Sequence, residues 1–146
     1  MTMRMSKAHV RVVDWASTEA LRIIRQQVFI DEQQVPPELE WDAEDAQATH
    51  FLLTLDQHPA GTARLLADGH IGRVALLPQA RGQGLGHQLM LAVMAHARQL
   101  GLTRLELSAQ THALAFYRQL GFVPCSNVYL DAGIPHQSMR WDLPTA

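Results

Sequence analysis

The stretch Gln79-Ala80-Arg81-Gly82-Gln83-Gly84-Leu85-Gly86 decides the fold of this chain. It follows residues 71–77, an apolar run typical of a strand that Pro78 ends, and it precedes apolar residues at helical spacing. Glycines permit a tight turn, and the unpaired N–H groups at the start of a helix favour a bound anion. The stretch therefore predicts a strand, a glycine turn and a helix whose first turn holds a phosphate.

Two better-known phosphate-binding motifs do not fit this turn. A P-loop closes with Gly-Lys-Ser/Thr, whereas Leu85-Gly86-His87 stands here. A dinucleotide-binding fingerprint needs its third glycine three positions after the second, and Gly86 follows Gly84 too closely. A turn that only permits tight packing remains the alternative to a phosphate site.

The remaining elements follow from the spacing of apolar residues and from turn-forming residues. Strands are expected at residues 9–13, 50–55, 60–66, 71–77, 102–107, 122–128 and 137–143. Helices are expected on the apolar stripes Leu21-Ile24-Val28 (capped by Ser17), Leu85-Leu89-Val93-Ala97-Leu100 (ended by Gly101) and Ala113-Phe116-Tyr117-Leu120 (ended by Gly121). Residues 31–49 are expected to form an acidic loop, because two prolines interrupt them. The sum is one α/β domain over residues 1–146, with a mixed central sheet flanked by helices.

Composition limits the classes of partner. The chain has 146 residues, 12 basic and 14 acidic side chains and a net charge of -2, so we expect neither nucleic acid nor anionic lipid as a partner. No signal peptide or membrane-spanning run is visible, which favours a cytoplasmic protein. Cys125 is the only cysteine and is expected to be a small core residue. The eight histidines lack zinc-site spacing, so we expect no metal.

Two motifs in order resemble the GNAT superfamily of coenzyme A-dependent N-acetyltransferases. The turn Gln79-Ala80-Arg81-Gly82-Gln83-Gly84 matches the family's Gln/Arg-x-x-Gly-x-Gly/Ala signature. About 30 residues later, Gln110-Thr111-His112-Ala113-Leu114-Ala115-Phe116-Tyr117-Arg118-Gln119-Leu120-Gly121-Phe122 resembles its Asn-x-x-Ala-x-x-Phe-Tyr-x-x-x-Gly-Phe helix. Val28-Phe29-Ile30-Asp31-Glu32-Gln33 and Gly133-Ile134-Pro135-His136 resemble the small ElaA-like branch. The resemblance runs from His9 to Leu143 and implies the GNAT (acyl-CoA N-acyltransferase) fold.

The resemblance implies acetyl-CoA as co-substrate and assigns residues to it. Backbone N–H groups of Arg81, Gly82, Gln83, Gly84, Leu85 and Gly86 would bind the pyrophosphate. The strand Val74-Ala75-Leu76 would pair its backbone with the pantetheine arm, and Gln110 and Phe116 would lie beside the coenzyme. The Arg81 side chain would add a phosphate contact, the alternative being a solvated arginine.

Two residues are candidates for the proton transfers. By spacing alone Tyr117 is a core aromatic residue, but the resemblance implies that its phenol protonates the departing thiolate. His136 follows a Gly-Ile-Pro turn and is the first candidate for the base, since an imidazole with a pKa of about 6.5 suits that role. A structural histidine is the alternative for His136. Glu32, His50 and His112 are weaker candidates for the base.

The acceptor is not specified by the sequence. Acidic residues 38–45 could attract a polyamine, an aminoglycoside or a basic peptide terminus, or could be a solvated loop. Arg25 and Arg73 could instead bind a substrate carboxylate, and Glu32 joins them as a candidate acceptor-binding residue. The chain is thus expected to acetylate an amine of a small molecule or peptide, with a non-catalytic acyl-CoA sensor as the alternative. A homodimer is compatible with so small a chain.

Overall fold

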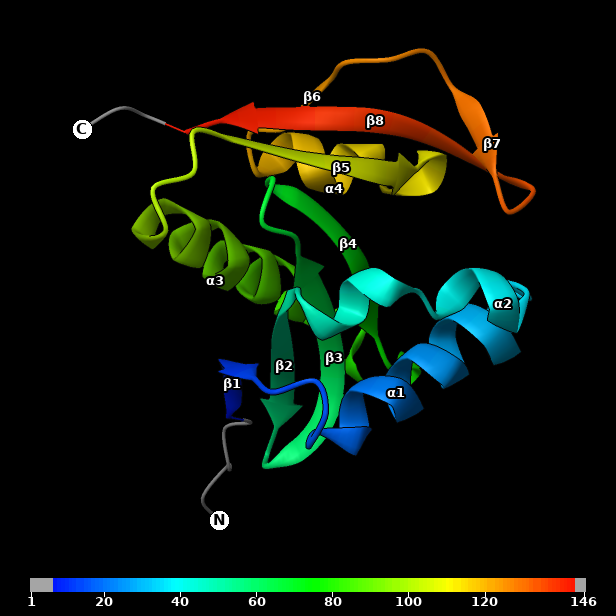
Figure 1. Ribbon diagram of the computed structural model, residues 1–146, viewed down its shortest axis with the longest axis vertical. Helices are drawn as coiled ribbons and strands as arrows, with labels where there is room; N and C mark the ends of the chain where they lie inside the picture. The colour runs from blue at the N-terminus through cyan, green and yellow to red at the C-terminus, as the bar shows by residue number, and fades with distance from the viewer. Residues whose placement is uncertain (1–6, 144–146) are drawn as a thin grey trace.

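The computed structural model describes residues 7–143, which form one mixed sheet with helices on both sides (Figure 1). The strand order is β1-β2-β3-β4-β5-β8-β6, with β7 paired to β8. The strands are β1 Ala8–Val13, β2 Thr49–Leu55, β3 His58–Leu65, β4 His70–Leu76, β5 Arg104–Gln110, β6 Val123–Pro124, β7 Tyr129–Asp131 and β8 Ile134–Asp142. The α-helices are α1 Glu19–Arg25, α2 Pro37–Glu40, α3 Leu85–Gln99 and α4 Leu114–Gln119. Shorter helical turns are η1 Gln26–Glu32, a π-helix, and the 3₁₀ turns η2 Ala43–Ala46, η3 Pro78–Ala80 and η4 Thr111–Ala113.

Helices α1 and α3 cover opposite faces of the sheet. Phe51 and Leu53 share one core cluster with the α3 residues, whereas Leu52 belongs to a second cluster with the α1 residues. This alternation follows from the two-residue period of a strand. The predicted stripe Leu21-Ile24-Val28 is buried, as are Leu85, Leu89, Val93 and Ala97, so both helices are confirmed. Leu100, the last residue of the second predicted stripe, is instead exposed and follows the end of α3.

The sheet opens into a fork between β4 and β5. These two strands form the one parallel pair within residues 7–143, and the pairing is confined to His70 with Glu106 and Ile71 with Leu107. Beyond it β4 turns away while β5 continues beside β8 (Figure 1). A register shift lies between β3 and β4 at this point, and Arg73 has a φ of 52°, a left-handed conformation that costs about 1–3 kcal/mol in a non-glycine residue. The irregularity leaves a cleft between the strands.

The helix boundaries agree with the predicted glycine stops but not with the predicted first cap. Gly101 and Gly121 have φ values of 80° and 104° and follow the ends of α3 and α4. Ser17 does not cap α1, since Thr18 precedes that helix and the Ser17 hydroxyl donates to Asp14. None of the helices within residues 7–143 has the length and apolar character needed to cross a bilayer.

Three expectations are wrong at the level of elements. The strand expected at residues 122–128 is broken, because β6 has two residues and β7 begins only at Tyr129. Cys125 is exposed rather than part of the core. Residues 31–49 are not a plain loop either, since Pro37 occupies the first position of α2, where its missing N–H is no loss.

Candidate active site

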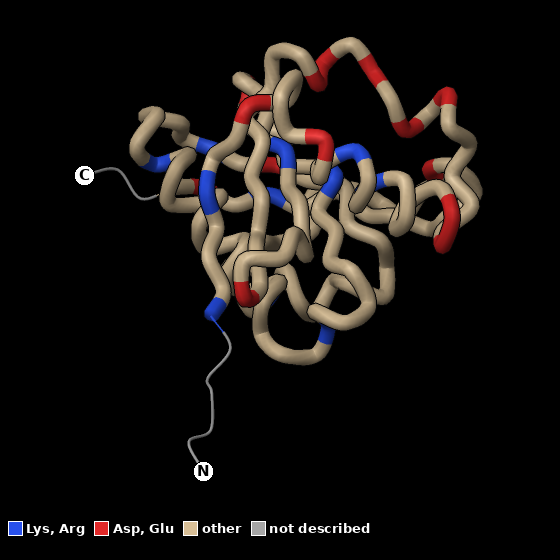
Figure 2. Tube along the Cα trace, turned by 90° about the horizontal axis from the view of Figure 1, so that it is seen from below, with Lys and Arg blue, Asp and Glu red and all other residues tan. Residues whose placement is uncertain are grey.

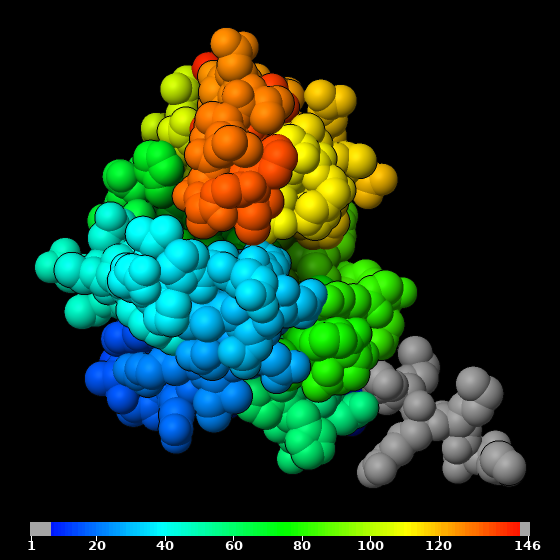
Figure 3. Space-filling model, turned by 90° about the vertical axis from the view of Figure 1, so that its right-hand side faces the viewer, coloured from blue at the N-terminus to red at the C-terminus, as the bar shows by residue number. Residues whose placement is uncertain are grey.

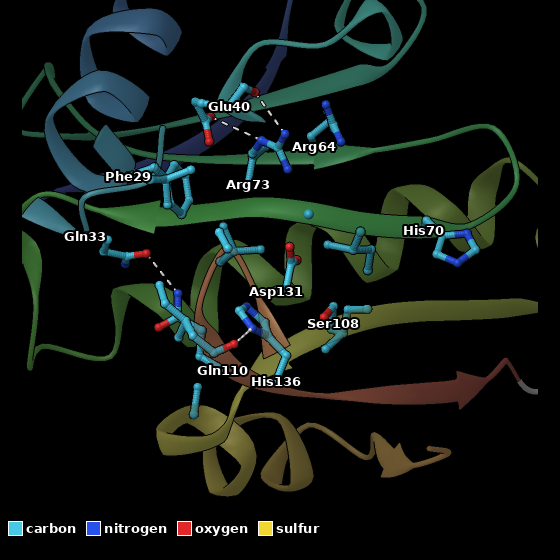
Figure 4. A pocket seen from close by; sticks show the side chains of 18 of the residues that line it. Phe29, Gln33, Glu40, Arg64, His70, Arg73, Ser108, Gln110, Asp131 and His136 are labelled. Atoms are coloured by element: carbon cyan, nitrogen blue, oxygen red, sulfur yellow. Dashed lines mark hydrogen bonds and ion pairs between the residues drawn. The ribbon is translucent and has the colours of Figure 1, made fainter. Parts of the chain in front are cut away.

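A cavity of about 600 Å³ lies where β4 and β5 diverge. Seen in space-filling form, the segment with η1 and α2 faces the β7–β8 hairpin across a furrow (Figure 3). The lining brings together six of the residues singled out from sequence, and Figure 4 draws several of them. They are Arg73, Val74, Gln110, His112, Tyr117 and His136.

Tyr117 supplies a neutral hydroxyl to this cavity. The residue lies on α4, packed edge to face against Phe116 and Phe122 at centroid distances of 5.0 and 6.1 Å. Burial raises the pKa of Tyr117 to about 12, because the phenolate would lose its hydration. Its hydroxyl has no hydrogen-bond partner within residues 7–143 and is free to donate to a ligand.

His136 presents one free nitrogen to the same cavity. It lies on β8 with 8% of its surface exposed, and its Nδ1 is 2.7 Å from the carbonyl oxygen of Ile134. A carbonyl only accepts, so Nδ1 carries the proton in the neutral ring and Nε2 keeps its lone pair. This tautomer is the one that a base acting through Nε2 requires.

The glycine turn presents a row of free N–H groups at the start of α3. The backbone N–H groups of residues 82–87 donate to no acceptor within residues 7–143, and Gly84 caps the helix without a side-chain bond. Gly82 and Gly84 are left-handed, with φ values of 75° and 79°, and a Cβ on either would meet nothing within 4 Å. An open row of donors at the positive end of a 15-residue helix fits a pyrophosphate.

Gly86 has a different role from the two glycines before it. A Cβ at this position would lie 3.3 Å from Cζ of Phe116, so glycine is what allows α3 to pack closely against α4. Phe116, expected beside the coenzyme, is thus also part of the contact between the two helices.

The edge of β4 that faces the fork is open where a pantetheine arm was expected. Ala75 and Leu76 pair with Thr62 and Gly61 on β3, while neither they nor Val74 pair with β5. The Leu76 carbonyl already accepts from Nε of Arg81 at 3.0 Å. Backbone groups alternate in direction along a strand, and the Leu77 N–H donates to the Ala60 carbonyl on β3, so Ala75 also faces β3. The backbone of Val74 is therefore the available part of this edge.

Glu32 and Arg81 pair with each other. The Arg81 guanidinium donates to the two carboxylate oxygens of Glu32 at 2.8 and 2.9 Å, and the two side chains are 41% and 43% exposed. The hydrogen bond from Arg81 lowers the pKa of Glu32. Glu32 is not part of the cavity lining, which corrects its assignment as an acceptor-binding residue or base. Because an exposed pair contributes little, Arg81 can exchange Glu32 for a phosphate.

Arg25 is a buried structural residue and not a substrate ligand. It is 1% exposed and donates to Glu40 at 2.7 Å and to Asp45 at 2.8 Å. Both carboxylates are themselves buried, so neither reading of residues 38–45, an attractor of cations or a solvated loop, holds for them. Many of the Asp and Glu positions lie along the loops at the upper right of Figure 2. The expectation that Arg25 binds a carboxylate substrate is therefore wrong.

Two further arginines complete this ion network. Arg64, which the sequence did not single out, donates to Asp42 at 2.8 Å and to Asp45 at 3.0 Å. Arg73 donates to the Glu40 carbonyl at 2.9 Å and to Asp42 at 3.2 Å, and Figure 4 shows it reaching from β4 toward Glu40. Burial raises the pKa of Glu40, whereas for Asp45 the bonds from Arg25 and Arg64 outweigh burial and lower the pKa. Arg73 lines the cavity, and Nη2 makes all the hydrogen bonds of its guanidinium within residues 7–143.

The two alternative histidines have separate surroundings. His50 is buried, donates from Nε2 to the Asp45 carbonyl and stacks on Trp15, so it cannot reach the cavity as a base. His112 is exposed, lines the cavity and lies 2.7 Å from the Gln110 side-chain oxygen. Within residues 7–143 no three His, Cys, Asp or Glu side chains gather as metal ligands.

One contact across the cleft was not foreseen. The Gln110 amide donates to the Gln33 side-chain oxygen at 2.9 Å, which joins the end of β5 to the residue after η1 (Figure 4). Phe29 of the same π-helix also lines the cavity. π-Helical turns are often found at functional sites, and the branch resemblance of Val28-Phe29-Ile30-Asp31-Glu32-Gln33 was the available signal.

Comparisons with known proteins agree with this geometry. A family profile described as "Acetyltransferase (GNAT) domain" matches residues 12–143. The "Uncharacterized N-acetyltransferase YjcF" of Bacillus subtilis is 35% identical over 123 residues, covering 82% of this chain and 88% of that protein. The crystal structure of an acyl-CoA N-acyltransferase from Pseudomonas aeruginosa is 37% identical with a TM-score of 0.82, covering 92% of this chain and 99% of that one.

Escherichia coli ElaA is a further structural neighbour, as the branch motifs predicted. Its crystal structure is 27% identical with a TM-score of 0.81, over 92% of this chain and 99% of that one. The profile match spans the sheet, the glycine turn and both candidate proton-transfer residues. The chain therefore belongs to the GNAT family of acetyltransferases.

Proposed function

We propose that this protein transfers an acetyl group from acetyl-CoA to a primary amine of a small molecule or peptide, by direct attack of the amine. The observation that carries the proposal is that Tyr117 and His136, a hydroxyl without a partner and an imidazole with a free Nε2, line one cavity. That cavity opens between the two strands that the glycine turn and α4 flank. The family profile and the relative's name, N-acetyltransferase, support an acetyl donor.

The chain has a complementary site for the donor. The free N–H groups of residues 82–87 would hold the pyrophosphate, and the open edge at Val74 would pair with the pantetheine amides. When bound there, the coenzyme supplies a thioester whose carbonyl an amine can attack. The chain's own residues then have two tasks, which are to orient the amine and to move two protons.

The two protons move in opposite directions. An amine nucleophile must be neutral at attack and must lose a proton as the amide forms, and Nε2 of His136 accepts that proton. The carbon–sulfur bond breaks as the amide forms, and the Tyr117 hydroxyl gives its proton to the departing sulfur. Since burial keeps that hydroxyl protonated, Tyr117 is the acid and His136 the base.

The ion network restricts the acceptor. A substrate carboxylate at Arg73 would come close to the carboxylates of Glu40 and Asp42, which are already in contact with that guanidinium. Meanwhile Glu44 and Asp131 line the cavity with no side-chain bond to another residue within residues 7–143. The cavity therefore has more free carboxylates than free cations, which supports an amine acceptor that lacks a carboxylate next to the reacting nitrogen.

Thiol release tests the proposal. Purified protein is incubated with acetyl-CoA and a panel of primary amines, free coenzyme A is measured, and acetylated products are identified by mass spectrometry. We expect release with at least one amine, strongly lowered but measurable in His136→Ala and unchanged in His58→Ala, a control at an exposed histidine on β3. If the protein binds acetyl-CoA but no amine yields thiol or product, the acyl-CoA sensor becomes the better description.

A further inference from the structure

Tyr129, to which the proposed chemistry assigns no task, lies directly across the sheet from His136. Tyr129 is the first residue of β7, and the antiparallel register pairs it with His136 on β8. The two rings are nearly parallel, with an interplanar angle of 19° and a centroid distance of 6.3 Å. Residues opposite each other on neighbouring strands project on the same side of the sheet, so Tyr129 borders the imidazole laterally.

The Tyr129 hydroxyl is anchored to β8, the neighbour of β7, and to β5, the next strand of the sheet. It hydrogen-bonds to the Ser108 hydroxyl on β5 and, at 3.0 Å, to the Ser138 hydroxyl on β8. Ser108 and Ser138 are themselves opposite each other in the β5–β8 register. The hydroxyl oxygen lies on the long axis of the ring, so its bonds to both serines fix the direction in which the Tyr129 side chain extends.

β7 has little else to hold it. The strand has three residues and, within residues 7–143, pairs with β8 alone. Its middle residue, Leu130, is 71% exposed, and Ala132 in the following turn has a φ of 52°. The bonds of the Tyr129 hydroxyl to Ser108 and Ser138 are therefore the side-chain anchor that ties the hairpin, and with it one side of His136, to the central sheet.

The other side of His136 is bordered by Gln110. These two residues are partners in the β5–β8 register, and Gln110 is itself held by Gln33 at 2.9 Å. The imidazole thus lies in a row between an anchored amide and an anchored phenol. The bond from Nδ1 to the Ile134 carbonyl sets the tautomer, so the ring can change orientation or tautomer only by rotating away from that carbonyl. A fixed neighbour on each side limits this rotation.

We propose that Tyr129 is a positioning residue that holds the His136 ring in the orientation and tautomer that leave Nε2 free for the acceptor amine. This inference rests on the proposed function, because it takes His136 as the base. Tyr129 touches no reacting group and acts only through His136. A small misplacement of a base lowers the rate without a matching loss of donor binding.

Two variants and one control separate the ring from the hydroxyl. Tyr129→Phe keeps the ring and removes both serine bonds, Tyr129→Leu removes both features, and Leu130→Ala is a neighbouring change on the same strand. We expect kcat to fall roughly 3-fold in Tyr129→Phe and roughly 10-fold in Tyr129→Leu, with KM for acetyl-CoA within about twofold of the parent. Leu130→Ala should match the parent, and thermal melting confirms that each variant is folded.

Nitrogen NMR of the His136 side chain gives a readout that is independent of turnover. In Tyr129→Leu we expect a larger fraction of the ring to carry its proton on Nε2 instead of Nδ1. An unchanged His136 spectrum in folded Tyr129→Leu would overturn the positioning role. Tyr129→Phe provides the same test should the leucine variant fail to fold.

A double variant distinguishes this inference from the function on which it rests. If Tyr129 acts only through His136, adding Tyr129→Leu to His136→Ala should lower the remaining kcat no further. A full additional 10-fold loss would overturn the inference. A His136→Ala variant as active as the parent would instead refute His136 as base, while the NMR comparison would still decide whether Tyr129 orients the ring.

Discussion

Tyr117, the proposed acid, shows how burial changes the protonation of a single residue. Its pKa, raised to about 12, keeps the hydroxyl protonated throughout the working range. In Tyr117→Phe we expect kcat to fall on the order of 10²-fold with little change in the dissociation constant of acetyl-CoA. Turnover is measured by thiol release and binding by calorimetry.

The pH profile adds a second check on Tyr117. Since the hydroxyl would lose its proton only near its raised pKa of about 12, any decline of activity around pH 9 must come from another group. That decline should therefore remain in the residual activity of Tyr117→Phe. Equal turnover in parent and variant would remove Tyr117 from the mechanism.

His50 should contribute to the pH dependence of stability. Burial lowers its pKa from 6.5, so the unfolded chain takes up a proton as pH falls through 6.5 while the folded chain resists it. The stability that neutral His50 provides is thus present above pH 6.5 and is lost below it. We expect the free energy of unfolding to fall less between about pH 7 and about pH 5.5 in His50→Gln than in the parent, measured with urea. Equal slopes for the two proteins would contradict this.

The residues that the sequence could predict are those carried by local motifs. The free N–H groups after Arg81 follow from a strand, a turn and a helix that are contiguous in the chain, and Tyr117 belongs to a helix motif. Arg25 and His50 were misassigned because what decides their roles is burial against Glu40 and Asp45, which are brought to them by tertiary packing. An arginine that folding buries has the same sequence signature as one that faces a ligand.

At the scale of elements, the glycine turn and the first turn of α3 are the proposed donor site. A Cβ at Gly84 meets no protein atom within 4 Å, so Gly84→Ala suffers only the left-handed strain, about 1–2 kcal/mol. The methyl group would, however, extend into the space in front of the free N–H groups. We expect acetyl-CoA binding to weaken by about 10-fold or more.

Gly101→Ala is the matched control for this variant. Gly101 follows the other end of α3 and has a φ of 80°, and a Cβ there would likewise meet no atom within 4 Å. An alanine at this position therefore has the same left-handed strain but lies away from the proposed phosphate site. Both variants should lose a similar amount of thermal stability, while only Gly84→Ala should lose affinity in calorimetry. Equal affinities for the two variants would argue against the turn as the pyrophosphate site.

The fork and the terminal hairpin are the elements that could not be predicted. The alternation of residues 71–77 indicates a strand but does not reveal that Arg73 is left-handed or that pairing with β5 stops after Ile71. Likewise, residues 122–128 have strand-like composition, yet the chain leaves the sheet after Pro124 and returns at Tyr129. Both features depend on which neighbouring strand is available, a property of the assembled sheet.

At the scale of the whole molecule, the ion network supports one side of the cavity. This side is formed by residues 39–44 and is called the acceptor wall. Arg25 extends from α1, Arg64 from β3 and Arg73 from β4, and all three meet carboxylates within residues 40–45. The segment that carries Leu39 and Glu44 into the cavity lining is thereby held against the sheet. Glu40, Asp42 and Asp45, whose charges suggested a binding loop in the sequence, therefore hold the acceptor wall in place.

Removing Arg25 tests this structural role. Arg25→Met keeps a side chain of similar length but leaves the buried carboxylates of Glu40 and Asp45 without that partner. Breaking a buried pair in this way costs about 3–5 kcal/mol, which urea unfolding measures. Because burial already raises the pKa of Glu40, loss of the arginine should favour its protonation further, so the loss of stability should be smaller at about pH 5 than at about pH 8.

Arg22→Met is the control for this variant. Arg22 is on the same helix and donates to the Trp15 carbonyl, so its replacement should cost much less stability. An Arg25→Met variant as stable as Arg22→Met, or a deficit independent of pH, would show that the network does not hold the acceptor wall in place.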